Sequence, residues 1–212
     1  MKLATAISFI AIAATSVNGI RTRPIRAAPV ELEDATMDSA TLEALRVSNK
    51  IIADAHVSLA SFEQAFLEVA EPMYHRVLKK DLLKQRFTSA REKGKAAVRA
   101  ASRLRLANTH VEDAEDFADT LKGFEKAGDS VLSALTHAKS AIVTSGACDQ
   151  TMTSLSALES TIRGIAAILS DFSPEPLQRT VLDSPTPLLK VLGQGYGRIE
   201  KACEGSEAIQ ES

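Results

Sequence analysis

Apolar residues recur at spacings of three, four and seven between about residue 42 and residue 69. This spacing places them on one stripe of an α-helix. Pro72 follows, and because proline removes a hydrogen bond inside a helix, we expect the helix to end before it. The apolar members of the stripe are Leu42, Leu45, Ile52, Ala55, Leu59, Phe62, Phe66 and Val69.

A second and longer apolar stripe runs from Ala114 to Ile142. Thr109, followed three residues later by Glu112, has the spacing of a capping box at a helix start. Gly146 stands just after the last apolar position, where glycine commonly ends a helix. The sequence therefore predicts one long helix between these two signals.

The last third of the chain predicts three more helices. The first of them begins near Asp149, with apolar positions at Met152, Leu155, Ile162, Ile165 and Leu169. Two Ser/Thr-Pro pairs then have the pattern of an N-cap followed by proline at the first helical position. The pairs are Ser173-Pro174 and Thr186-Pro187, and the helices that they open are predicted at 174–183 and 187–203.

The apolar positions between residues 73 and 106 do not keep to one face. Those from Phe87 onward would lie nearly half a turn away from Tyr74, Val77, Leu78 and Leu82 on a continuous helix. Ser89 and Glu92 have capping-box spacing at the change. We predict two helices, about 73–86 and 90–106, with one bent helix as the alternative.

These elements indicate an all-α fold, an antiparallel bundle of five to six helices joined by short loops. We place a single helical-bundle domain at residues 38–205 and a flexible tail at 206–212. The chain has two cysteines, Cys148 and Cys203. In an exported chain this even count predicts one disulfide, which would tie the start of one helix to the end of the last.

The N-terminus has the features of a secretory signal peptide at residues 1–19: a lysine, an uncharged apolar run and small residues up to Gly19. We therefore expect a secreted protein, and no later segment is apolar enough to span a bilayer. Residues 20–37 form a disordered leader or a pro-segment ending at Arg26. The run Arg23-Pro24-Ile25-Arg26 resembles the R-x-L-R host-entry motif of secreted oomycete effectors, with isoleucine in place of leucine.

Catalytic motifs are not evident: we find no G-x-S-x-G elbow, H-E-x-x-H pair or Walker loop. His110 and the acids from Glu112 to Asp119 could hold a divalent cation. Acids in a first helical turn also interact favourably with the helix dipole, and we prefer that interpretation. We expect no enzyme activity, no cofactor and no metal.

Charge is strongly segregated. Residues 75–105 contain eleven Lys or Arg against two acids, whereas the rest of the chain has 14 basic and 25 acidic residues. Pairing with Glu112 to Asp119 on the next helix would neutralise part of this charge. We do not expect a nucleic-acid partner, because stacking aromatics and binding motifs are missing. The candidate partner surface comprises Arg76, Lys80, Lys84, Arg91, Lys95, Arg99 and Arg103.

Two functions fit these features. The first is an effector-like interaction protein that binds an unknown protein partner through the basic face. The alternative is a carrier of a small apolar ligand between helices, since Ala, Ser and Gly stripes with few aromatics could leave space for one. The plan of the chain, with a signal peptide, a short leader and an Ala/Ser-rich helical domain, is similar to that of fungal hydrophobic-surface-binding proteins and cell-wall mannoproteins.

Overall fold

Helices build the whole described part of the protein in the computed structural model, which describes residues 39–75 and 77–210. The all-α bundle is therefore confirmed. The predicted signal peptide, the leader, Gly19, Arg26 and Arg76 lie outside the described residues. The helices are α1 (Ser39–Leu67), α2 (Lys80–Ser102), α3 (Val111–Thr144), α4 (Cys148–Phe172), α5 (Glu175–Asp183) and α6 (Thr186–Gln210), with short 3-10 helices at Glu71–Tyr74 and Leu104–Leu106.

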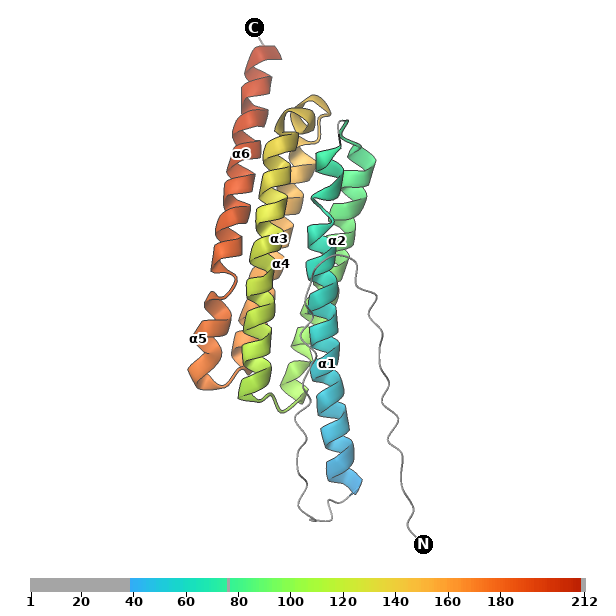
Figure 1. The fold of residues 1–212 in the computed structure, drawn as a ribbon, viewed down its shortest axis with the longest axis vertical. Coiled ribbons are helices and arrows are strands. Elements are labelled where there is room, and N and C mark those ends of the chain that lie inside the picture. Colours follow the sequence, from blue (N-terminus) through green and yellow to red (C-terminus); the bar gives the residue numbers. More distant parts are fainter. Residues whose placement is uncertain (1–38, 76, 211–212) are drawn as a thin grey trace. The chain divides into compact units, whose positions relative to one another are not determined.

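Successive long helices run in opposite directions, α1 to α4 up and down in turn, and α6 beside α3 (Figure 1). The packing partners form a closed ring: α1 contacts α2, α2 contacts α4, α4 contacts α6, α6 contacts α3, and α3 contacts α1. The short helix α5 packs mainly on α4. Helix α2 thus lies between α1 and α4, and α3 is on another side of the bundle. No described helix is both long enough and apolar enough to cross a membrane.

Aromatic residues fill the centre of the bundle. Phe62 and Phe66 of α1 meet Phe124 of α3, with ring centroids 5.1 and 6.2 Å apart, and all three are fully buried. About two helical turns earlier on each helix, His56 of α1 stacks on Phe117 of α3, with ring centroids 4.1 Å apart. Burial lowers the pKa of His56, and the nearby acids of α3 oppose that shift. The predicted core faces of α1 and α3 therefore do meet.

The predicted break near residues 87–89 is wrong, because α2 continues through it from Lys80 to Ser102. Its buried stripe advances by alternating steps of four and three residues, through Leu83, Phe87, Ala90, Gly94, Ala97 and Ala101. The chain instead changes direction before Lys80, where Tyr74 and Val77 are 51% and 74% exposed. These two exposed side chains had suggested a separate apolar face, whereas the real face begins at Leu83.

The start of α3 differs from the predicted cap by one residue. Helix α3 starts after His110, whose backbone N–H donates to Asp113 Oδ2 at 2.9 Å, in place of the predicted pair Thr109 and Glu112. Thr109 has another use: its hydroxyl donates to the carbonyl of Phe172 at 2.6 Å and so ties the α2–α3 connection to the end of α4.

Two further predicted caps are also displaced. Ser173 ends α4, with its hydroxyl donating to the Leu169 carbonyl at 2.6 Å, and it does not start α5. Glu92 lies mid-helix and accepts a hydrogen bond from Lys95 at 2.9 Å, so it caps nothing.

The predicted stop at Gly146 is confirmed. Gly146 has φ 63°, a left-handed conformation that glycine adopts without a steric penalty. Its N–H donates to the Val143 carbonyl, and the N–H of Ala147 donates to the Ile142 carbonyl, both at 3.0 Å. These two bonds satisfy the last carbonyls of α3 in a Schellman motif and turn the chain into α4.

The predicted disulfide is confirmed. Cys148 and Cys203 are joined with an S–S distance of 2.06 Å and a Cα–Cα distance of 6.1 Å, within the usual range. Cys148 is the first residue of α4, and Cys203 lies in the second half of α6. The bond therefore fixes the start of α4 to the last helix.

Candidate functional site

A groove with a volume of about 330 Å³ lies between α2 and α4. Its size is at the lower end of the range for small-molecule sites. The wall on α2 has residues at steps of three and four, and so does the wall on α4, because each helix turns one face toward the other. The lining residues are Lys84, Phe87, Thr88 and Arg91 from α2, and Asp149, Gln150, Thr153, Ser154 and Ala157 from α4.

The floor of the groove is apolar and its inner end is closed. Phe87, only 4% exposed, and Ala157 supply apolar surface between the two walls. Beyond them α2 and α4 approach so closely that a Cβ on Gly94 would lie 2.7 Å from Thr161 Cγ2. Phe62 of the aromatic core lies directly behind this contact. The groove therefore ends where the two helices come into close contact.

The rim of the groove carries positive charge. Lys84 and Arg91 are exposed and stand seven residues apart, on the same face of α2. The described residues offer Lys84 no acid within 4 Å, and the nearest acid to Arg91 is its neighbour Glu92, with 4.0 Å from Nε to Oε1. Asp149 is an acid on the facing wall, but it pairs with neither cation in the described chain.

A buried donor without a partner points to the same place. The side-chain nitrogen Nε2 of Gln150 is buried and has no hydrogen-bond partner among the described residues. Gln150 lies in the first turn of α4, whose N-cap is Ala147, a residue that has no side-chain acceptor to offer. The backbone N–H groups of a first helical turn also lack intrahelical partners. Hydrogen-bond donors and the cation of Lys84 therefore gather at this end of the groove, which suits an anionic group.

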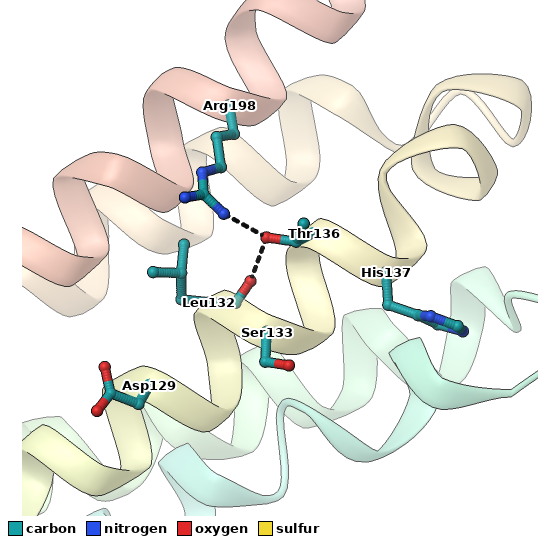
Figure 2. Close-up of a pocket in the computed structure, with 6 residues that line it drawn as sticks. All are labelled: Asp129, Leu132, Ser133, Thr136, His137 and Arg198. Carbon is teal, nitrogen blue, oxygen red and sulfur yellow. Dashed lines mark hydrogen bonds between the residues drawn. The ribbon is translucent and has the colours of Figure 1, made fainter.

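A second pocket, of about 480 Å³, is open and shallow and lies between α3 and α6 (Figure 2). Its main polar group is already engaged: Arg198 Nη1 donates to Thr136 Oγ1 at 2.7 Å, and Thr136 donates to the Leu132 carbonyl at 2.8 Å. Figure 2 shows that His137 and Asp129 point away from each other along α3. The side chains do not converge on one point, so the α2–α4 groove is the better candidate site.

The structure divides the predicted partner surface among several roles. Lys84 and Arg91 line the groove. Lys80 donates to the carbonyls of Gly146 and Ser145, at 3.1 and 3.5 Å, and so stabilises the end of α3. Lys95 pairs with Glu92, while Arg99 and Arg103 are exposed at the far end of α2.

The predicted pairing of basic residues on α2 with the first acids of α3 is wrong for the described part of the chain. No ion pair there joins Arg99, Arg103 or Arg105 to the acids between Glu112 and Asp119; Asp119 pairs instead with Lys122 on its own helix. The reason is the topology, because α2 packs between α1 and α4 and has little contact with α3. Across residues 39–75 and 77–210, no group of three or more metal-ligating side chains comes together.

Sequence reasoning missed the α4 wall of the groove. Asp149, Gln150 and Ala157 belong to no sequence motif. A glutamine on a helix can be recognised as part of a site only when the neighbouring helix is known. The sequence could have indicated the groove only through the residues that α2 and α4 turn toward each other. Finding them required the knowledge that α2 packs against α4 and not against α3.

Neither a family model nor a curated protein sequence matches the chain. Solved structures do match its fold. Ligand-binding domain 1 of the Penicillium marneffei MP1 protein, complexed with arachidonic acids, has a TM-score of 0.56 at 13% identity, over 74% of this chain and 98% of that domain.

Two more structures match in the same way. AFMP4P in complex with palmitic acid has a TM-score of 0.59 at 13% identity, over 72% of this chain and 99% of its own. Ligand-binding domain 2 of the Penicillium marneffei MP1 protein, complexed with multiple arachidonic acids, has a TM-score of 0.53 at 11% identity, over 78% and 98%. At these identities the likeness establishes a shared fold, and it covers nearly the whole of each neighbour.

Proposed function

We propose that the protein is a non-enzymatic binder of a small apolar ligand, with long-chain fatty acids as the ligand class. The observation that carries this proposal is the shared fold with three helical domains that are complexed with arachidonic or palmitic acid. The comparisons thus favour the carrier interpretation over the protein-partner interpretation. The proposal of an effector that binds another protein finds no support in them.

Features of the α2–α4 groove are consistent with such a ligand. An apolar floor of Phe87 and Ala157 can cover part of an acyl chain, and burial of apolar surface is the main source of affinity for such chains. After Phe87 the buried stripe of α2 consists of Ala and Gly. Small side chains interlock little, so a modest separation of α2 from α4 costs less apolar contact here than between large side chains.

Export of the protein remains part of the proposal. Its support is the signal-like N-terminal sequence together with the disulfide, which persists in oxidising compartments. A secreted binder of fatty acids would carry or sequester them outside the cell. Recovery of the protein from the culture medium, with its N-terminus determined by sequencing, tests this part.

Ligand binding itself is tested by native mass spectrometry of the delipidated protein titrated with palmitic acid. We expect a saturable adduct of discrete stoichiometry. Ala157→Leu, which fills the floor of the groove, should weaken the adduct, whereas Ala167→Leu, on the exposed face of the same helix, should not. Absence of saturable binding by the folded wild-type protein would overturn the proposed function.

A further inference from the structure

The outer end of the α2–α4 groove has the chemistry of a carboxylate site. Gln150 presents a buried N–H donor that no described residue accepts, and an unmade hydrogen bond of this kind destabilises a folded protein. Native proteins leave few such groups unpaired, and each one calls for an explanation. A ligand atom that accepts the hydrogen bond is one explanation, and the position of Gln150 on the groove wall supports it.

Of the two cations on the facing wall, Lys84 lies opposite this donor. Lys80 reaches the Ser145 and Gly146 carbonyls just before α4, and Gly94 meets Thr161, so α2 and α4 run in the same direction and Lys84 lies level with Gln150. Arg91 lies two helical turns further along, beside Ala157, at the other end of the groove. Neither cation is neutralised by an ion pair closer than 4.0 Å within the described residues. Asp149 also lines the groove, but it pairs with neither of them.

From these observations we infer that Lys84 and Gln150 bind the acid headgroup of the ligand, so that the protein selects fatty acids over neutral lipids of the same chain length. The inference rests on the proposed function, since it assigns one end of the same ligand. A carboxylate accepts hydrogen bonds at two oxygens, so it can satisfy Gln150 and one cation together. Charge-assisted hydrogen bonds are also about twice as strong as neutral ones.

The same geometry orients the ligand. The groove follows α4 from Gln150 to Ala157, about 10 Å at 1.5 Å per residue. It ends where Gly94 meets Thr161, with Phe62 behind. The acid is therefore held at the first turn of α4, and the acyl chain runs over Phe87 along the groove toward Ala157.

The experiment compares palmitic acid with 1-hexadecanol, which has the same chain and no charge, by equilibrium titration monitored with native mass spectrometry. The test protein is the variant Lys84→Gln. Its matched control is Lys95→Gln, which removes the same charge from α2 without touching the groove. Both positions are exposed, so both variants should keep the wild-type melting temperature.

For the wild type we expect palmitic acid to bind about tenfold or more tightly than 1-hexadecanol, which corresponds to one charge-assisted hydrogen bond. The groove variant should lose about this factor for the acid and bind the alcohol within about twofold of the wild type. The control variant should match the wild type for both ligands. Gln150→Met, which removes the donor and keeps the length of the side chain, should weaken binding of the acid more than binding of the alcohol, because a carboxylate is the stronger acceptor.

The possible failures are distinguishable. If the wild type binds acid and alcohol equally, or if the groove variant binds the acid as tightly as the control, the headgroup assignment is wrong and the proposed function stands. If the folded wild type binds neither ligand, both are wrong.

Discussion

Substitution of Gly94 by alanine tests how closely α2 and α4 approach at the inner end of the groove. Gly94 is buried in the middle of α2, where glycine weakens a helix. A Cβ added there would lie 2.7 Å from Thr161 Cγ2 and 3.1 and 3.3 Å from two ring atoms of Phe62. Two independent neighbours thus confine the new methyl group.

The magnitude follows from two opposing terms. Non-bonded carbons are most stable about 3.5–4.0 Å apart, so the new Cβ and Thr161 would be about 1 Å too close. Overpacking of a buried site costs about 1–3 kcal/mol. The gain in helix propensity from Gly to Ala is about 0.5–1 kcal/mol. Phe62 prevents the new methyl group from moving away from Thr161. We therefore expect Gly94→Ala to lower the free energy of unfolding by about 1 kcal/mol.

The assay is thermal and chemical unfolding, in which this loss corresponds to a fall of about 2–4 °C in Tm for a protein of this size. Gly164 of α4 is the matched control, because a Cβ built there would have no heavy atom within 4 Å apart from its chain neighbours and the backbone of its own helix. Gly164→Ala should therefore raise stability by about 0.5–1 kcal/mol. The same substitution thus has opposite signs on two neighbouring helices.

A rescue experiment identifies the cause. Thr161→Ser removes Cγ2 and keeps the hydroxyl that donates to the Ala157 carbonyl at 2.8 Å. In this background Gly94→Ala should lose about 1 kcal/mol of its cost, which a double-mutant cycle reads as coupling between the two positions. If Gly94→Ala is as stabilising as Gly164→Ala, α2 and α4 are not in close contact there and the described inner end of the groove is incorrect.

Three other perturbations give separate tests. Replacement of both Cys148 and Cys203 by serine should lower stability by up to about 4 kcal/mol in the chain-entropy treatment of a 55-residue separation, measured by calorimetry. Burial raises the pKa of Glu63, so its contribution to stability is fully present below the ordinary pKa of a glutamate and is lost as pH rises through the raised value. Glu63→Gln should therefore increase Tm at pH 7 and have little effect near pH 4, and an equal gain at both pH values would contradict the burial argument. Lys80→Ala removes the bond to the Gly146 carbonyl and should cost about 0.5–1 kcal/mol in urea unfolding, whereas no loss would mean that this exposed contact is not maintained in solution.

The long helices could be predicted from sequence because their apolar stripes are unambiguous. In α1 and α3 the large residues, Phe62, Phe66 and Phe124 among them, keep one face over many turns. The stripe of α2 is harder to recognise, because Ala and Gly fill it after Phe87. Beyond Phe87 the true face is marked only by small residues, so the larger Tyr74 and Val77 were assigned to the buried face although both are exposed. The predicted break followed from that error.

Helix caps were predicted less accurately than helix faces. Thr109 and His110 are neighbours with acids three residues after each of them, so the sequence allows two registers for the start of α3. The choice depends on a tertiary contact, the hydrogen bond from Thr109 to the Phe172 carbonyl at the end of α4. Information about a residue 63 positions away is not present in a local pattern.

The basic segment shows why net charge is a poor guide to a binding surface. Lys80 is engaged at the end of α3, Lys95 pairs with Glu92, and Arg86 bridges Glu68 and Glu71 just after the end of α1. Each of these cations has a structural partner that the composition could not reveal. A charge remains available for a ligand where it lacks such a partner, and it selects an amphipathic acid only where apolar surface lies beside it. On α2 both conditions are met at Lys84, which lies one turn from Phe87 and faces the unpaired donor of Gln150.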